Sequence, residues 1–477
     1  ACSYLQGGSC IMNDEDLGFL SIADASEKIA LKKLSPVELT EALLRRAEEL
    51  DPKLNAYLLK DADKALAAAQ AAEKAIHSGR KLGPLHGVPF GLKDIVDTAG
   101  LRTTCHSKIL VDNIPQRDAT VAAKLKAAGA ILMGKLSTHE FALGGPAFDL
   151  PWPPARNPWN PNHHPGGSSS GSGAAVAAGM LPMAIGTDTG GSVRNPASCC
   201  GIVGMKATYG RVSRAGVFPL SYSLDHIGPM TRTVVDNALM LQVISGSDQR
   251  DPASANAAVP DFTVKIEDGV KGLKIGYLRH FHEVDSPAHE EMAKSLDDAV
   301  DVLKNEGAEV RDVSFFPLSE LAAANRIVLL SEAYSIHRKW LAERPEDYAK
   351  ATRDRILPGA FMGAADYVDA LRRRAIYREH FKRLMSEVDV IICASSMDPA
   401  CRIDDEAEVG RTYGRQARTP FNLLGVPALA VPTGFSNEGL PLSMQVVGKA
   451  FDEATVYRVA RAYERVADWS THRPKPN

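Results

Sequence analysis

The sequence predicts an α/β fold: a single domain in which one mixed, mostly parallel β-sheet is covered by helices on both faces. Strand-like and helix-like patterns alternate along the chain, which is typical of a sheet wrapped by helices. Strand patterns also occur on both sides of the segment 247–264, which is rich in Asp, Ala and Pro and is the best candidate for a linker. We therefore expect segments from the whole chain to contribute strands to one sheet, in a domain that extends over residues 13–472.

The predicted elements follow in order from local signals. The stretch S-P-V-E at 35–38 combines an N-cap, a proline at the first helical position and a glutamate three residues after the cap, which predicts a helix through about residue 50. An alanine-rich helix is expected at 61–77, and the apolar stretch V-P-F-G-L-K-D-I-V predicts a strand within 86–96. Further helices are expected at 119–128, 172–179 and 234–245, and further strands at 130–133, 183–185, 274–278, 388–393, 428–431 and 444–447.

The composition indicates a globular protein and excludes several classes. Of 477 residues, 45% are hydrophobic and 24% are charged, a balance that allows a large core. The net charge of −3, with dispersed Lys and Arg, gives no reason to expect a nucleic-acid partner. Seven cysteines without C-x-x-C spacing argue against a disulfide framework and a zinc site. No apolar run is long enough to span a membrane, and residues 1–12 are interpreted as a foreign or disordered terminus rather than a signal peptide, so we expect a cytoplasmic location.

A glycine- and serine-rich run, P-G-G-S-S-S-G-S-G at 165–173, can be interpreted in several ways. A flexible linker is the plainest interpretation, but the run continues directly into the pattern of a packed helix and a buried strand. A phosphate-binding loop would require G-x-x-x-x-G-K-[ST], which is absent. A nucleophile elbow centred on Ser169 would need a preceding strand, where the chain has N-P-W-N-P-N-H-H-P. The remaining interpretation is a loop fixed at a helix N-terminus.

A second stretch of small residues, G-T-D-T-G-G-S-V-R at 186–194, places Ser192 directly after two glycines. Glycines allow backbone N–H groups to face a pocket, which is what a developing oxyanion needs. No histidine is near enough in the sequence to take a proton from Ser192. Lys93 ends the apolar stretch H-G-V-P-F-G-L-K-D and leaves the face opposite the apolar one, so it is a candidate for a lysine that lines a site, against the ordinary alternative of an exposed lysine.

These stretches resemble the amidase signature family of hydrolases. The resemblance rests on G-G-S-S-S-G-S-G-A-A-V-A-A-G, on G-T-D-T-G-G-S-V-R-N-P-A, and on the upstream H-G-V-P-F-G-L-K-D-I-V-D-T-A-G. The 24-residue separation of Ser168 and Ser192 also agrees with the family pattern. The resemblance is dense over about 82–232 and resumes at P-F-N-L-L-G-V-P-A-L-A-V-P-T-G and G-L-P-L-S-M-Q-V-V-G-K-A-F-D-E-A-T, with a divergent middle.

The resemblance implies a catalytic triad in which Ser192 is the nucleophile, Ser168 the bridging hydroxyl and Lys93 the base. An ammonium cannot accept a proton, so burial would have to lower the pKa of this lysine from ~10.4 to near neutrality. The bridging serine of the family follows a cis peptide bond, which would here join Gly167 to Ser168. No metal or cofactor is expected, and none of the thirteen histidines is assigned a catalytic role.

The resemblance also implies an oxyanion hole, whereas the segment 144–156 differs from the polar stretch of many relatives and is a candidate wall of the substrate pocket. Asp188 and Arg194 flank the loop and are expected to order it. In the segment 144–156, an apolar wall for an aryl or alkyl group is one interpretation and a surface loop with a locally packed tryptophan is the other. Backbone N–H groups expected to bind the oxyanion are those of Thr189, Gly190, Gly191 and Ser192. Candidate substrate contacts are Gly144, Phe148, Trp152, Ser169, Arg211 and Phe218.

The sequence therefore predicts an amidohydrolase that cleaves the C–N bond of small apolar or aryl amides, with esters and carbamates as further substrates, through an acyl-enzyme on Ser192. We expect a small-molecule substrate, no nucleic-acid or membrane partner, and a monomer or homodimer without an obligate partner. The alternative within the resemblance is the A subunit of glutamyl-tRNA(Gln) amidotransferase, which frees ammonia from glutamine. The stretch Q-A-R-T-P at 416–420 lacks the acidic residue expected there, although Arg355 could bind a carboxylate. A catalytically dead scaffold is a second alternative.

Overall fold

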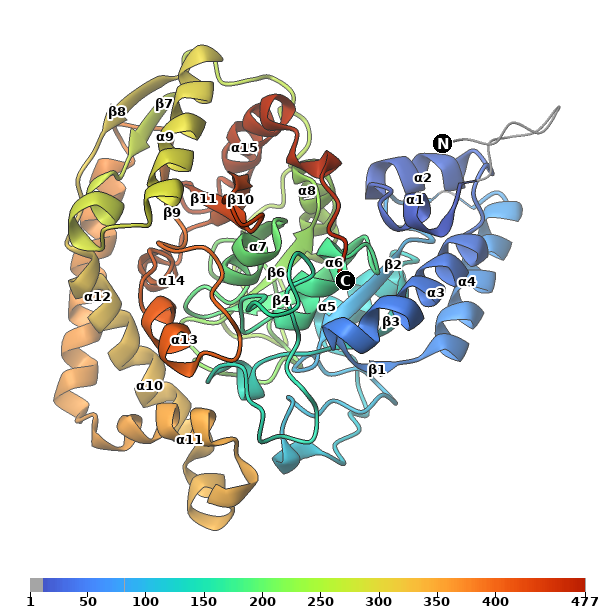
Figure 1. Ribbon diagram of the computed structural model, residues 1–477, viewed down its shortest axis with the longest axis horizontal. Helices are drawn as coiled ribbons and strands as arrows, with labels where there is room; N and C mark the ends of the chain where they lie inside the picture. Colours follow the sequence, from blue (N-terminus) through green and yellow to red (C-terminus); the bar gives the residue numbers. More distant parts are fainter. Residues whose placement is uncertain (1–11, 81, 477) are drawn as a thin grey trace.

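The computed structural model describes residues 12–80 and 82–476, and within them eleven strands form one sheet (Figure 1). Both halves of the chain contribute strands, as predicted. Across the sheet the order is β1 (Tyr57–Lys60), β3 (Ile131–Leu136), β2 (Pro89–Lys93), β4 (Met183–Asp188), β6 (His226–Thr231), β5 (Val203–Lys206), β10 (Ala428–Phe435), β11 (Pro441–Val447), β9 (Val390–Ala394), β7 (Lys274–Tyr277) and β8 (Glu309–Asp312).

Parallel pairing is concentrated in two blocks of this mixed sheet. β2 is parallel to β3 and β4, and β7 is parallel to β8 and β9. The strands between these blocks pair antiparallel, and the edge strand β1 is antiparallel to β3. β10 and β11 are joined by a short turn, which permits only antiparallel pairing. The predicted α/β fold with one mixed sheet is confirmed.

Each helix predicted from local signals is present. The Ser35 hydroxyl caps the first of them, because it accepts hydrogen bonds from the N–H groups of Val37 and Glu38. This helix runs past the predicted end and stops where Asn55 adopts a left-handed conformation, φ 49°. The five predicted helices are α3 (Pro36–Leu54), α4 (Ala62–His77), α5 (Thr120–Ala127), α6 (Ser170–Ala177) and α8 (Val234–Ile244).

Among the described residues, ten further α-helices and four further strands were not predicted. α9 and α15 bury one side and could have been recognised from their apolar periodicity. α10 and α12 do not show such a stripe, because apolar side chains are distributed around them. The additional helices are α1 (Asp14–Gly18), α2 (Ile22–Ala30), α7 (Arg194–Cys200), α9 (Glu290–Asn305), α10 (Leu318–Glu343), α11 (Lys350–Ile356), α12 (Ala364–Leu384), α13 (Glu406–Tyr413), α14 (Thr419–Leu424) and α15 (Glu453–Ala467), and the additional strands are β1, β5, β6 and β8.

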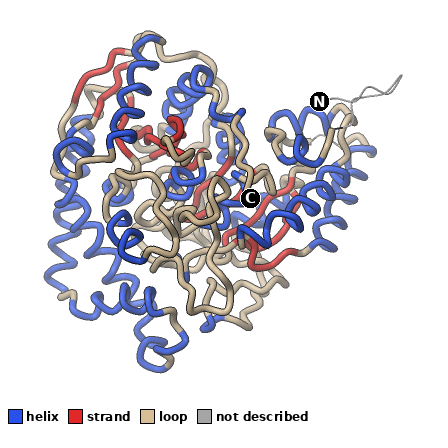
Figure 2. The backbone as a smooth tube through the Cα atoms, viewed as in Figure 1, coloured by secondary structure: helices blue, strands red, loops and turns tan. Residues whose placement is uncertain are grey.

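Helices cover both faces of the sheet, as predicted. α6 and α7 pack against each other and on the central strands, and α8 and α15 form a second pair on those strands. Helices α1 to α4 lie at one side of the molecule and α9 to α12 at the other (Figures 1 and 2). The segment 247–264 is a loop, and the strands on both sides of it belong to the same sheet.

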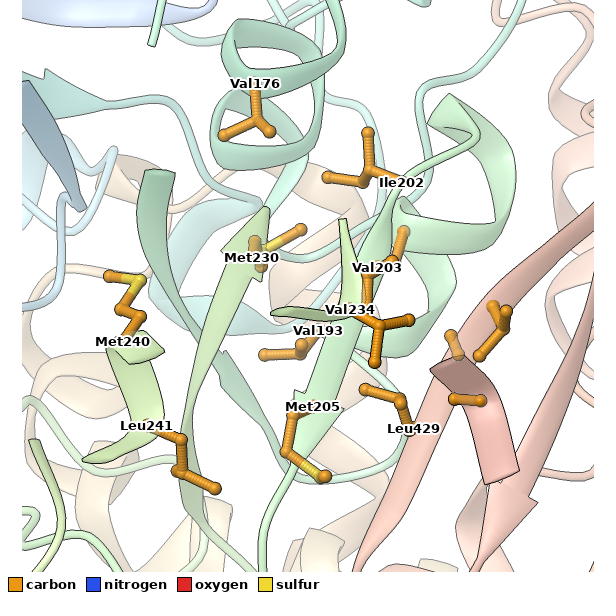
Figure 3. Close-up of a cluster of buried hydrophobic side chains, with 14 of the residues drawn as sticks. Val176, Val193, Ile202, Val203, Met205, Met230, Val234, Met240, Leu241 and Leu429 are labelled. Carbon is orange, nitrogen blue, oxygen red and sulfur yellow. The ribbon is translucent and has the colours of Figure 1, made fainter. Parts of the chain in front are cut away.

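A continuous apolar core surrounds β5 and β6 (Figure 3). Met205 of β5 and Met230 of β6 are fully buried among side chains from the covering helices, including Val176 of α6 and Leu241 of α8. Val193, in the loop that follows β4, is also fully buried in this cluster. Close packing of this kind holds side chains in fixed positions, so the start of the loop after β4 is anchored in a rigid part of the protein.

The remaining expectations concern the N-terminal residues, the domain limits and membrane-spanning helices. The interpretation of residues 1–12 falls outside the described residues except for Met12, which packs against the core. The domain limits 13–472 stay a prediction. No helix in the described part of the chain is long and apolar enough to cross a membrane.

Candidate active site

Lys93 and Ser168 meet in the interior, although 75 residues separate them in the sequence. Lys93 is the last residue of β2 and is fully buried. Its Nζ lies 2.7 Å from Ser168 Oγ and 2.7 Å from the Oγ1 of Thr187. Because β2 pairs in parallel with β4, Lys93 emerges beside the end of β4, where Thr187 lies. The hydroxyls of a loop and a strand therefore converge on one buried amine.

The environment of Lys93 favours its neutral form. Burial lowers the pKa of Lys93 to about 7, against the opposing influence of the Asp188 and Asp225 carboxylates. Near neutral pH a large fraction of this side chain is therefore a free amine. Its lone pair can accept a proton from Ser168 while one of its N–H groups donates to Thr187.

The glycine- and serine-rich run is fixed against the loop that carries Ser192. The peptide bond between Gly167 and Ser168 is cis, as the resemblance implied. The N–H of Ser169 donates to the carbonyl of Ser192 over 3.2 Å, and its hydroxyl accepts from the N–H of Thr187 over 3.1 Å. Ser168 is 2% exposed, whereas Ser192 is 9% exposed and lines a cavity. Ser192 is therefore accessible to a ligand in the cavity, whereas Ser168 does not line it.

The loop after β4 is ordered by one buried carboxylate. Asp188 accepts hydrogen bonds from the N–H groups of Gly191 and Val193 and from Nε and Nη2 of the Arg194 guanidinium. The amide of Asn422, which is 234 residues away, also donates to it over 2.8 Å. Burial alone would raise the pKa of Asp188, but the charge and hydrogen bonds of Arg194 hold it well below the usual range. Asp188 and Arg194 thus hold the loop in shape.

The backbone N–H groups of this loop differ in their availability. The N–H of Gly191 is already engaged by Asp188 over 2.9 Å. Those of Thr189, Gly190 and Ser192 donate to no protein group within residues 12–80 and 82–476, so they are free for an oxyanion. Gly191 has a φ of 126°, and a Cβ there would lie 2.4 Å from the Nε of Arg418. Only glycine fits this position.

Ser192 opens into a cavity of about 560 Å³. Gly190, Gly191 and Ser192 line it together with residues of α10 and of the segment before and within α14. This main cavity also receives the side chains of Arg326, Arg355 and Arg418, here called the arginine wall. The cavity is large enough for a small-molecule substrate.

A second cavity of about 680 Å³ lies on the other side of Ala142 and Leu220, which line both spaces. It reaches Thr187 and Thr189. Its apolar side chains include Phe218. The hydroxyl of Thr189 donates to the buried carboxylate of Asp225 over 2.6 Å, so this cavity touches the group that holds one end of the loop.

The predicted substrate contacts are scattered. The carbonyl of Gly144 accepts a hydrogen bond from Arg355 at the main cavity, and Phe218 lines the second cavity. Phe148 is 58% exposed, and Trp152 packs edge-on against His106 with ring centres 5.7 Å apart. Ser169 binds the backbone of Thr187, and Arg211 pairs with Glu453 over 3.2 Å. Phe148, Trp152, Ser169 and Arg211 are not brought to either cavity.

Several contributors to the site were missed by sequence reasoning, among them Arg326 of the main cavity. Thr187 and Asp225 have no role in the sequence-based interpretation, and the stretch that contains Arg418 was considered only for its lack of an acid. Thr187 could have been suspected because it lies in the same motif as Ser192. The sequence carries no signal for the contact of Arg418 with Gly191, because the two residues are far apart in the chain.

The comparisons with known proteins agree with the fold and the motifs. The family model described as Amidase matches residues 38–457. The A subunit of glutamyl-tRNA(Gln) amidotransferase from Roseiflexus sp. (strain RS-1) is 40% identical over 480 residues, which cover 95% of this chain and 98% of that protein.

Two solved structures are similar over nearly their whole length. A chain from "an unexpected vestigial protein complex" that "reveals the evolutionary origins of an s-triazine catabolic enzyme" superposes with a TM-score of 0.89 at 31% identity, covering 96% of this chain and 100% of that one. A bacterial aryl acylamidase of the amidase signature family superposes with a TM-score of 0.87 at 27% identity, covering 96% and 98%.

These relatives correct one expectation. The 40% identical protein is named as one subunit of a larger enzyme, over almost its full length. That finding contradicts the sequence-based prediction of a monomer or homodimer without an obligate partner.

Proposed function

We propose that this chain, which belongs to the amidase family and is a hydrolase of amide C–N bonds, releases ammonia from a carboxamide as the amide-cleaving subunit of a larger amidotransferase-type enzyme. The contact of Lys93 with Ser168 behind Ser192 carries the chemical part of the proposal. The 40% identity with an amidotransferase subunit supports the assembly. A cytoplasmic location is part of the same proposal.

In the proposed reaction, Ser192 Oγ attacks the amide carbonyl carbon. Its proton passes to Ser168 Oγ, and the proton of Ser168 passes to Lys93 Nζ. The negative charge that develops on the carbonyl oxygen is stabilised by the free N–H groups of Thr189, Gly190 and Ser192.

The C–N bond then breaks and the proton returns along the same path to the departing nitrogen, so ammonia leaves and an ester on Ser192 remains. A water molecule, deprotonated by the same relay, attacks this ester. The products are the carboxylic acid and the free serine.

Hydrolysis of aryl amides is the second candidate. The similarity to an aryl acylamidase and the apolar second cavity beside Thr189, with Phe218 in its wall, favour it. Esters and carbamates would react by the same steps, because each presents a carbonyl to Ser192. A catalytically dead scaffold is disfavoured by family membership and by the buried contact of Lys93 with Ser168.

The test measures ammonia or amine release from glutamine, aliphatic amides, aryl anilides and aryl carbamates. It uses the purified chain and the assembly that co-purifies with it from the cells that express it. Ammonia release that depends on Ser192 and increases in the assembly supports the proposal. Cleavage of anilides by the chain alone, with no gain in the assembly, supports the second candidate. No Ser192-dependent turnover of any substrate in either preparation would contradict both.

A further inference from the structure

We infer that the substrate of this site is an anionic carboxamide, an amide whose acyl part carries a carboxylate and no ammonium group. The inference rests on the proposed function and specifies the substrate class. It is argued from the charges around the main cavity, which is the one that contains Ser192.

The main cavity has cations in its wall and no compensating anions. Arg326, Arg355 and Arg418 line it, and none of the described residues that line it is Asp or Glu. None of the three arginines forms an ion pair within the part of the chain that the structure describes. A cavity lined by charges of one sign raises the local concentration of ligands of the opposite sign.

Arg418 is the member of the arginine wall with an unused donor in the interior. It is 4% exposed, and its Nη1 donates to the carbonyl of Ser395 over 2.9 Å and to the hydroxyl of Ser396 over 2.7 Å. Its Nε is buried with no hydrogen-bond partner and lies against Gly191, next to the nucleophile.

A buried donor without a partner is unfavourable. The guanidinium to which it belongs lines the cavity, so a carboxylate bound there can form a charge-assisted hydrogen bond with it. Burial, and secondly the charge of Arg194, lower the pKa of Arg418 to about 10, so the side chain is still a cation at neutral pH.

Arg355 and Arg326 extend the positive wall toward the surface. The guanidinium of Arg355 stacks 3.9 Å from the ring centre of Tyr413 and donates to the carbonyl of Gly144, which holds it in place. Arg326 is exposed on α10. A planar, fixed guanidinium can bind a carboxylate through two parallel hydrogen bonds.

An ammonium group would find no carboxylate among the described residues that line this cavity. Asp188, the carboxylate nearest in the sequence to Ser192, is fully buried and paired with Arg194 behind the loop. Asp225 lines the second cavity and not the main one. An amide substrate with an α-ammonium group would therefore place that charge beside arginines with no carboxylate to compensate it, which costs binding free energy.

Three molecules of nearly equal size test this inference. Glutaramate is glutamine without the ammonium group, and pentanamide lacks both charged groups. We expect kcat/KM for glutaramate to exceed that for glutamine and that for pentanamide by about tenfold or more, equivalent to about 1.4 kcal/mol. Succinamate and adipamate extend the comparison to shorter and longer spacings between the amide and the carboxylate.

A binding measurement separates this inference from the proposed function. Calorimetry on the Ser192→Ala variant compares the affinities of the same compounds without turnover. Tighter binding of an ω-amide carboxylate than of glutamine and pentanamide supports the inference, even if the chain needs partner subunits for activity. Equal or tighter binding of glutamine would overturn it, as would a preference for pentanamide or no binding of any of the compounds.

Matched variants locate the effect. Arg326→Gln is expected to reduce the preference for glutaramate over pentanamide about threefold to tenfold, whereas Arg338→Gln, the same change at an exposed position of α10 away from the cavity, should leave it unchanged. Arg418→Met is expected to have a larger effect if the variant folds. An equal effect of Arg326→Gln and Arg338→Gln would contradict the role of the arginine wall.

Discussion

The two sides of the site are built in opposite ways. On one side, the frame of the proposed reaction consists of Lys93, Ser168, Asp188 and Arg194, and its charges and hydroxyls have partners inside the protein. On the other side, the arginine wall presents three cations without ion-pair partners in the described residues. The frame comes from β2, β4 and the loops beside them, whereas two of the three arginines come from α10 and α11.

This difference indicates that the reaction and the choice of substrate depend on different residues of the site. A fully paired, buried frame fixes the positions of reacting groups before a substrate arrives, which is what catalysis by orientation and preorganised donors requires. Unpaired charges in an open cavity select a ligand that supplies the missing countercharge. Changes in the frame should therefore abolish turnover of every substrate, whereas changes elsewhere should have smaller or substrate-dependent effects.

The largest effect is expected for Ser192→Ala, which removes the proposed nucleophile that the frame holds in place. Turnover of every amide should fall by roughly 10⁴-fold to 10⁶-fold, the range found when single members of a catalytic triad are removed. The measurement is ammonia release at saturating substrate, with the melting temperature as a control for folding. Activity close to that of the wild type would show that Ser192 is not the nucleophile.

Lys93→Met should cost about 10²-fold to 10⁴-fold at pH 7, because it removes the base and keeps the length of the side chain. In the wild type, kcat/KM should rise about tenfold per pH unit up to about pH 7 and then level off, because only the uncharged amine accepts a proton. This rise should be absent in the variant.

Lys93→Met should lower activity without lowering the free energy of unfolding. The pKa of Lys93 is lower in the folded state than in the unfolded state, so the unfolded chain binds more protons between about pH 7 and ~10.4. The wild type therefore gains stability as the pH rises through this window and loses it as the pH falls. At pH 7 the variant should be at least as stable as the wild type by denaturant unfolding. A less stable variant would indicate that Lys93 is a structural residue.

Asp188→Asn should damage both the loop and the fold. It leaves the buried guanidinium of Arg194 without its countercharge, which typically costs about 3–5 kcal/mol in the free energy of unfolding. Denaturant unfolding measures this loss. Glu408→Gln, at the exposed pair of Glu408 with Arg411, is the control and should leave stability unchanged. Equal effects of the two changes would mean that Asp188 does not hold the loop.

Asp225→Asn should lower kcat/KM about tenfold, the effect of weakening one charge-assisted hydrogen bond to Thr189. Burial raises the pKa of Asp225 to about 6, so its carboxylate is ionised at pH 7 and above. Thr189→Val removes the other partner of the same contact. The double variant should therefore be little worse than either single variant. Fully additive losses would show that the contact does not act as a unit.

Phe148→Ala is expected to have the smallest effect. The side chain is 58% exposed and lines neither cavity, so kcat/KM for anilides and for ω-amide carboxylates should stay within about twofold of wild type, the range of ordinary surface substitutions. A selective loss of kcat/KM for anilides would instead support the interpretation of 144–156 as an apolar wall of the substrate pocket.

The elements that sequence reasoning identified depend on near neighbours. The cap at Ser35, the apolar runs of β2 and β4, and the small residues of α6 are encoded within a few positions, so their class and approximate bounds follow from local pattern. Helices such as α10 carry no one-sided apolar stripe, because they contact different neighbours around their circumference, and they were missed.

The sequence by itself determined the α/β class, the family and the identity of Lys93, Ser168 and Ser192 as candidates, because these depend on short, dense motifs. Only the tertiary structure decided which charges are compensated. Asn422 reaches Asp188 from 234 positions away, and Arg418 lies against Gly191 from another part of the chain. Charge pairing and cavity walls depend on residues that are far apart in the chain and that only the fold brings together. A local sequence pattern contains no information about the distances between such residues.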